Sequence, residues 1–243
     1  MAENTARVSA YRIGALGAIL TAAGTLASGP LALPVVALVQ PQPLWAGAAV
    51  FVENFHRIQT VPFYFGFVLL TGSILMLVSI CAQSKGRPAS LAALVFMSIG
   101  GALVFLNYLT QTTFIPAIVD GYTPEFAPVI AAFSMSNPGS LAWAIEMWGY
   151  GFMGLGTWLA AGFFGAGRLE RAARILFILN GVASVSGALV VSFDLEGVFS
   201  IPGLVGYGLW NVLYVALSVV FYLVLRRRRA FAAADEPSSH GSA

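Results

Sequence analysis

Residues 61–82 read VPFYFGFVLLTGSILMLVSICA, and the residues that follow, 83–88, read QSKGRP. The first stretch has no charged side chain, and it matches the ~20 apolar residues that a helix needs to cross a hydrocarbon core of ~30 Å. The second stretch contains Lys85 and Arg87, and basic residues mark the cytoplasmic loops of helical membrane proteins. Together the two stretches predict a transmembrane helix that ends on the cytoplasmic side.

The rest of the chain repeats this alternation of apolar runs and short polar connections. Of its 243 residues, 58% are hydrophobic and 9% are charged, whereas a soluble domain carries about 25% charged residues. So few charges cannot coat a water-facing surface, and we therefore expect the bilayer to be the main solvent. Six segments are long and apolar enough to span it, namely 13–39, 61–82, 90–118, 139–165, 172–192 and 201–225.

Basic residues separate these segments in a pattern that predicts orientation. Eleven of the twelve Lys and Arg residues lie in four clusters on one predicted side. The clusters are Arg7 and Arg12; Lys85 and Arg87; Arg168, Arg171 and Arg174; and Arg226, Arg227, Arg228 and Arg229. The gaps on the other side carry acidic residues instead. Because basic loops stay inside, residues 1–12 and the tail 226–243 are both predicted to be cytoplasmic.

The predicted fold class is therefore an all-α polytopic transmembrane bundle of six spans. Arg strongly outnumbers Lys, and Ala and Gly are abundant, which is typical of a GC-rich genome, so we expect a bacterial plasma membrane. The apolar stretch after Arg12 is longer than the ~7–15-residue core of a signal peptide. We interpret it as a retained first span, with cleavage near residues 27–28 as the alternative. Pro30 and Pro34 are expected to kink or unwind its outer end.

Two connections on the predicted outer side are long, at residues 40–60 and 119–137. The first contains WAGAAVFVENFHRIQ at 45–59, which is expected to form an interfacial helix leading into the second span. On one helix Glu53, His56 and Arg57 would lie together at i, i+3 and i+4. The second connection ends in Asn-Pro at 137–138, where Asn is expected to cap the fourth span.

Polar residues within the spans are the candidate binding residues, because such groups are expensive in a membrane and usually face the bundle interior. Glu146 lies inside the fourth span, and Trp143 and Tyr150 share its helical face at i−3 and i+4. Counting from the predicted span ends places polar residues of the third and sixth spans at a similar depth, in the outer half. We expect one polar pocket there, open to the outer face. Its candidate residues are Glu146, Asn107, Gln111, Tyr150, Asn211, Trp143, His56, Arg57 and Glu53.

Each candidate also has a structural interpretation. Trp and Tyr near span ends form interfacial belts, and Asn and Gln in spans often bridge helices by hydrogen bonding. Glu146 would be structural if it were protonated or paired with Arg57. Glu53 and His56 have the spacing of one arm of a carboxylate di-iron site. The sequence offers no second arm, so we predict neither a metal nor a cofactor.

Missing residues exclude several functional classes. Cys81 is the only cysteine, so an intrachain disulfide and a cysteine-based metal site are excluded. No predicted span contains Lys, which excludes a retinal Schiff base. No Gly-rich phosphate loop and no Arg ladder of a voltage sensor is present. The net charge of +2 follows from the topology, so we expect no nucleic-acid partner.

The string NPGSLAWAIEMWGYGFMGLG at 137–156, with NYLTQTTF at 107–114 and LWNVLYV at 209–215, is similar to a group of bacterial membrane proteins. These proteins have six spans and are grouped in families of unknown function. The resemblance covers roughly residues 55–225 and implies the six-span fold. It carries over no catalytic residue, since such families have no assigned activity.

Three hypotheses about function follow. The leading one is binding of a small amphipathic or lipid-like molecule in the Glu146 pocket, for sensing, transport or assistance to a partner. It predicts that Glu146→Gln weakens ligand binding while folding survives. The second is an intramembrane enzyme in which Glu146, or Glu53 with His56, acts as acid or base on a lipid or prenyl substrate. The third is a structural subunit. The expected partners are membrane lipids, the small ligand, and a second copy or another membrane protein.

Overall fold

The computed structural model describes residues 2–234 of the chain and the side chains of residues 8–231. Within that range all regular elements are helices. The α-helices are α1 (Ala2–Leu26), α2 (Ala32–Val39), α3 (Ala48–Asn54), α4 (Val61–Gln83), α5 (Pro88–Leu109), α6 (Ile115–Asp120), α7 (Ala127–Phe133), α8 (Leu141–Ala160), α9 (Arg168–Phe193) and α10 (Ile201–Ala234). Turns of π-helix lie at Ala27–Leu31 and Thr110–Phe114, and 3₁₀ turns at Arg57–Thr60, Pro124–Phe126, Ala161–Phe163 and Glu196–Phe199.

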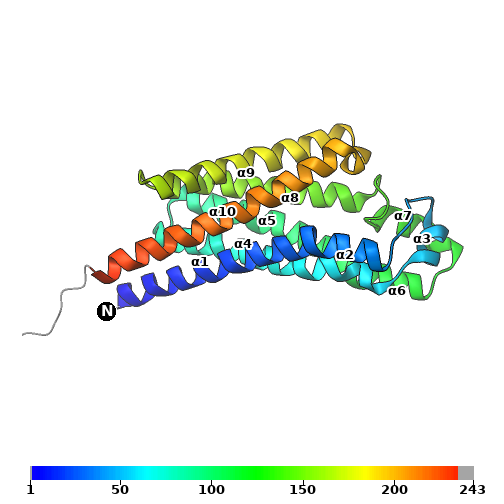
Figure 1. Ribbon diagram of the computed structural model, residues 1–243, viewed down its shortest axis with the longest axis horizontal. Coiled ribbons are helices and arrows are strands. Elements are labelled where there is room, and N and C mark those ends of the chain that lie inside the picture. The colour runs from blue at the N-terminus through cyan, green and yellow to red at the C-terminus, as the bar shows by residue number, and fades with distance from the viewer. Residues whose placement is uncertain (1, 235–243) are drawn as a thin grey trace, which may run out of the picture.

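The long helices lie side by side along the longest axis of the molecule (Figure 1). Helix α1 packs on α4, α5 on α8, and α8 on α9, while α10 lies against both α1 and α9. The expectation of an all-α membrane bundle is therefore confirmed. Among the described residues, five helical segments are long and apolar enough to cross a membrane: Val8–Val39, Arg57–Gln83, Pro88–Asp120, Arg168–Phe193 and Ile201–Phe231.

Helix α8, which corresponds to the fourth predicted span, is not among those five segments. It has 20 residues and lies between α5 and α9. Four glycines, three tryptophans and Glu146 lower its mean hydropathy. Its composition therefore reflects a helix that faces other helices more than it faces lipid.

Small residues allow the central helices to approach closely. A Cβ added to Gly100 on α5 would meet the carbonyl oxygen of Gly149 on α8, closer than real Cβ atoms approach. On the other side of α8, a Cβ at Gly151 would lie 2.8 Å from the Cβ of Ala188 on α9. Such small residues let helix backbones pack tightly where lipid offers no hydrophobic driving force. Tight packing here leaves space only for side chains that fit between the helices.

The end of the first span that contains Pro30 is continuous rather than unwound. The π turn Ala27–Leu31 contains Pro30 and joins α1 directly to α2. A π turn shifts the hydrogen-bonding pattern by one residue, and π turns are frequent at functional sites. The expected interruption at Pro30 is thus a local widening of one helix.

The short helices α3, α6 and α7 form a cap at one end of the bundle, and the start of α1 and the end of α10 lie at the opposite end (Figure 1). The cap has its own hydrophobic core, separate from that of the long helices. Its buried residues are Ala48, Phe51, Ile115, Ile118 and Ile130. We call the opposite end the basic end, because the four Lys and Arg clusters lie in the segments found there.

Two expectations about the cap side are wrong. Helix α3 ends at Asn54, and Phe55 and His56 are extended, so Glu53, His56 and Arg57 do not share one helix. The residue that caps α8 by position is Ser140, not Asn137, because residues 137–140 form a turn before the helix begins. In the first case the backbone becomes extended where a helix was expected, and in the second the helix begins three residues later than the expected cap implies.

Candidate functional site

Glu146 is the centre of a buried polar cluster between α8 and α5. Its side chain is 5% exposed. One carboxylate oxygen, Oε2, accepts a hydrogen bond from Asn107 Nδ2 at 2.9 Å, and the other, Oε1, accepts one from Tyr108 Oη at 2.8 Å. Since both oxygens are bonded to protein groups, the desolvation of Glu146 is compensated by hydrogen bonds to the neighbouring helix α5.

The cluster extends in both directions from Glu146. Tyr108 Oη also lies 2.8 Å from Tyr150 Oη, and Gln111 Nε2 donates to Asn107 Oδ1 at 3.3 Å. The structure thus brings together four of the predicted site residues: Glu146, Asn107, Gln111 and Tyr150. Tyr108, which links Glu146 to Tyr150, was not selected from the sequence. Its signal was available, because residues 104, 107, 108 and 111 follow the i, i+3, i+4, i+7 spacing of one buried helix face.

The loop after α7 covers this cluster. Gln111 Nε2 donates to the carbonyl oxygen of Phe133 at 2.8 Å, and its Oε1 accepts from the backbone N–H of Met135 at 3.1 Å. Trp143 Nε1 donates to the carbonyl oxygen of Met135 at 2.8 Å. Trp143 and Gln111 therefore fasten the loop over Glu146 from two different helices.

The structure separates Glu53, His56 and Arg57 from Glu146. All three side chains are exposed on the cap. His56 Nδ1 accepts the backbone N–H of Ile58 at 3.2 Å and so caps the 3₁₀ turn that follows. Arg57 Nη2 forms an ion pair with Asp120 Oδ2 at 2.5 Å, so the alternative in which Arg57 pairs with Glu146 is not found.

Asn211, the remaining candidate, lies outside the cluster, on α10 facing the π turn of the first span. Its Nδ2 donates to the carbonyl oxygen of Tyr207 at 2.8 Å. Gly29 makes room for it, since a Cβ there would lie 2.9 Å from Asn211 Oδ1. Asn211 thus belongs to the contact between the first and last long helices.

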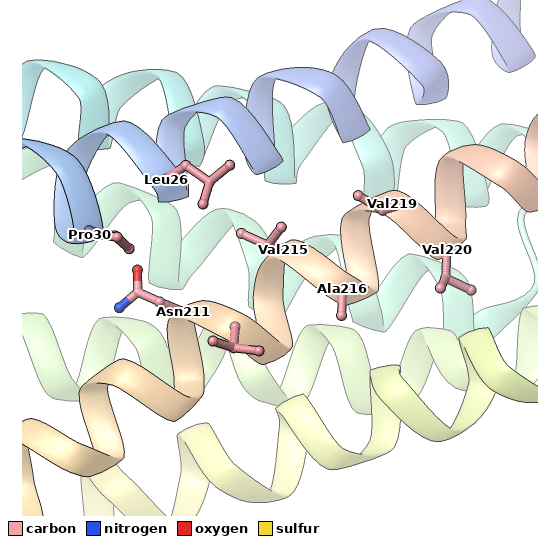
Figure 2. Close-up of a pocket in the computed structure, with 8 residues that line it drawn as sticks. Leu26, Pro30, Asn211, Val215, Ala216, Val219 and Val220 are labelled. Atoms are coloured by element: carbon pink, nitrogen blue, oxygen red, sulfur yellow. The ribbon is translucent and has the colours of Figure 1, made fainter.

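Next to Asn211 a groove of 450 Å³ runs between α1 and α10. Figure 2 shows Leu26 and Pro30 on one side and the side chains of α10 on the other. The lining residues are Leu26, Pro30, Asn211, Val212, Val215, Ala216, Val219 and Val220. Its volume lies within the ~300–1,000 Å³ of small-molecule sites. Asn211 is the one polar side chain in this lining, so the groove suits a molecule that is largely apolar.

Neither place resembles a metal centre. Within the described residues no group of three or more His, Cys, Asp or Glu side chains is arranged to hold a metal ion. A buried carboxylate bonded to an amide and a phenol can order helices, and an apolar groove with one amide can hold an amphipathic molecule. The Glu146 cluster thus suits a structural role, and the groove suits ligand binding.

No protein-family model matches the chain, and no curated protein or solved structure matches it. The similarity to six-span families of unknown function therefore stays a prediction. The function must be inferred from the geometry of the cluster and the groove.

Proposed function

We propose that this chain is a six-span protein of a bacterial inner membrane with both ends in the cytoplasm. Helix α8 supports a total of six spans, because it is long enough to be counted with the other five. Its 20 residues at 1.5 Å each reach ~30 Å, the thickness of the hydrocarbon core. Its low hydropathy is compatible with a span that α5 and α9 cover on two sides. The grouping of Lys and Arg at the basic end supports the orientation.

A cysteine-labelling experiment tests this topology. Two variants, Gly121→Cys and Gly165→Cys, are made in a Cys81→Ser background. Gly121 precedes α8 in the chain and Gly165 follows it, and both positions are exposed. Membrane-impermeant maleimide added to intact cells is expected to label Gly121→Cys and not Gly165→Cys. Labelling of both positions from the same side would show that α8 does not cross the membrane.

We further infer that the protein binds a neutral, amphipathic, lipid-like molecule in the α1–α10 groove. The observation that carries this inference is the groove itself, which is open and apolar, with the buried Asn211 as the polar residue at one end. An amide offers both donors and acceptors, and it carries no formal charge. A ligand with one hydrogen-bonding group and an apolar body therefore fits the lining.

The groove is a better binding site than the Glu146 cluster that the sequence favours. Both oxygens of Glu146 are bonded, and the loop at Phe133–Met135 covers the cluster. A ligand would have to displace these hydrogen bonds before it reached the carboxylate. In the groove it would displace only lipid chains. The same argument gives acid–base catalysis at Glu146 less support than binding in the groove.

Native mass spectrometry of protein extracted gently from its own membrane tests the proposed function. Wild type is expected to retain one small molecule in stoichiometric amount. Ala216→Phe fills the groove and is expected to abolish retention. Val95→Phe adds the same ring to the lipid-facing side of α5, where Val95 is 54% exposed, and should leave retention unchanged.

Two results would overturn the proposal. One is wild-type protein that carries only exchangeable bulk lipid. The other is an Ala216→Phe protein that retains the molecule as well as wild type does. Equal loss in Ala216→Phe and Val95→Phe would count against the groove as well, because it would indicate a general effect of added aromatic surface.

A further inference from the structure

Tyr207 extends the row of α10 residues that line the groove. Asn211, Val215 and Val219 follow it at intervals of four residues, and residues at i and i+4 lie on the same face of a helix. Tyr207 therefore lies one turn from Asn211, towards the cap. Its side chain is exposed, so it borders the same opening and not the buried core of the bundle.

Gly29 in the π turn of the first span brings polar atoms of Tyr207 and Asn211 together. A Cβ on this glycine would lie 2.5 Å from Tyr207 Oη and 2.9 Å from Asn211 Oδ1, so both oxygens reach the same small space beside α1. Figure 2 shows the oxygen of Asn211 directed across the groove towards Pro30. The nitrogen of Asn211 donates to the carbonyl oxygen of Tyr207 instead. The end of the groove thus offers a hydroxyl donor and an amide acceptor close together.

The depth of these atoms limits which lipids can reach them. The basic end of α10 is held on α9 by the ion pair between Arg228 and Glu170, at 2.7 Å. Asn211 lies ten residues after Ile201, where α10 begins, and fifteen residues before Arg226. These separations are about 15 and 22 Å along the helix, so the amide lies inside the hydrocarbon core of ~30 Å and not at its boundary.

A charged headgroup does not fit the groove at this depth. A phosphate group inside the hydrocarbon core is as costly as the charged side chains that are rare in spans. The described residues that line the groove include no Lys or Arg that could pair with it. The polar group of the ligand must therefore be uncharged, which excludes a phospholipid headgroup.

We propose that the groove binds an uncharged long-chain alcohol, with its hydroxyl between Tyr207 and Asn211 and its chain along Val215 and Val219. A hydroxyl group both donates and accepts hydrogen bonds, so it donates to Asn211 Oδ1 and accepts from Tyr207 Oη. An ether or a ketone has no hydrogen to donate to the amide oxygen. The open side of the groove lets a long chain continue into the bilayer. This inference rests on the proposed function, because it assigns the ligand class of the same groove.

Competition binding in mixed micelles, with tritiated hexadecanol as the probe, tests the assignment. Hexadecyl methyl ether has the same chain and oxygen but no hydrogen to donate, and it is expected to compete about tenfold less well, because one hydrogen bond is lost. Phosphatidylglycerol is expected not to compete at the mole fraction at which unlabelled hexadecanol displaces half of the probe. Equal competition by the alcohol and the ether would overturn the proposal, and so would equal competition by the phospholipid.

Two substitutions assign the two hydrogen bonds. In Asn211→Leu the alcohol and the ether should compete equally, because the acceptor that distinguishes them is gone. Tyr207→Phe removes one hydroxyl and should weaken hexadecanol binding about tenfold. The matched control is Tyr64→Phe, because Tyr64 is 53% exposed on α4, against 43% for Tyr207, and does not line the groove. Its affinity should equal that of wild type.

These variants also show when the assignment is wrong. Equal affinities of Tyr207→Phe and Tyr64→Phe for hexadecanol would remove the tyrosine from the site. A preference for the alcohol that persists in Asn211→Leu would remove the amide. Either result contradicts the proposal, because it places the hydroxyl of the ligand elsewhere.

Ala216→Phe separates a failure of this assignment from a failure of the groove itself. It is expected to abolish the binding of hexadecanol and of the ether. If it does so while wild type fails to distinguish the two compounds, the groove binds lipid but the alcohol assignment is wrong. If Ala216→Phe binds hexadecanol as tightly as wild type does, the groove is not the site and both proposals are wrong.

Discussion

Glu146 and Asn211 are both buried polar residues in the first half of their helices, yet their surroundings are opposite. Glu146 lies where α5 and α8 approach closely, and each of its oxygens is bonded to α5. Asn211 lies where α10 faces the π turn of the first span, and it borders an open groove. A polar residue in a span is therefore not by itself a binding residue. What decides is whether the neighbouring helix leaves space beside it.

The largest effect is expected from removing the carboxylate of the closed cluster. Glu146→Leu leaves the donors of Asn107 and Tyr108 without their acceptor in a buried place, and it should destabilise the fold by about 3 kcal/mol. Glu146→Gln keeps one acceptor and should lose about 1 kcal/mol. Thermal unfolding in detergent measures both.

The same variants separate the cluster from the groove. Ligand retention by Glu146→Gln is expected to equal that of wild type once the protein is folded, contrary to the expectation from sequence. If a stable Glu146→Gln protein lost the ligand, the ligand would bind at the Glu146 cluster and not in the groove.

A somewhat smaller loss of stability is expected where the helices are closest. Gly100→Ala forces α5 away from the carbonyl of Gly149, and overpacking of this kind costs about 1–3 kcal/mol. Gly206→Ala on α10 is the control, because a Cβ there meets no atom within 4 Å. Its melting temperature should be unchanged or slightly raised, since Ala is the better helix former. Equal melting temperatures for the two variants would argue against tight α5–α8 packing.

At the groove, Asn211→Leu should change binding more than stability. The amide nitrogen donates within its own helix, to the carbonyl oxygen of Tyr207, so the fold loses little. A ligand that uses the amide would lose about 1.4 kcal/mol, which is about tenfold in affinity. Asn180→Leu serves as the control, because Asn180 Nδ2 bridges to Thr157 Oγ1 at 3.0 Å within the bundle. That variant is expected to lower stability and to leave the affinity unchanged.

The smallest effect is expected at the ion pair on the cap. The side chains of Arg57 and Asp120 are 67% and 60% exposed, and such surface pairs contribute about 0–1 kcal/mol. Asp120→Asn should therefore change the melting temperature very little. In the double variant Asp120→Asn/Glu146→Gln the two changes in the free energy of unfolding should add, because the two sites share no contact. A coupling above about 0.5 kcal/mol would mean that the cap pair and the cluster form one network.

Much of the cluster was predictable, because its members follow from spacing along single helices. Asn107 with Gln111, and Glu146 with Tyr150, share faces at i and i+4, and counting from the span ends places them at similar depth. The loop over Glu146 was not predictable. The bonds of Trp143 and Gln111 to Met135 depend on how far the loop reaches after α7, which no local pattern encodes.

The sequence by itself determined the helical class and the long apolar segments, because hydropathy and length are properties of each segment alone. It also placed Lys and Arg at the ends of those segments. The tertiary structure decided which polar residue is enclosed and which borders a groove, and which arginine is paired. These outcomes depend on the distance and rotation between helices far apart in the chain, such as α1 and α10. Glycines, a π turn and the Arg228–Glu170 pair set that distance and rotation together.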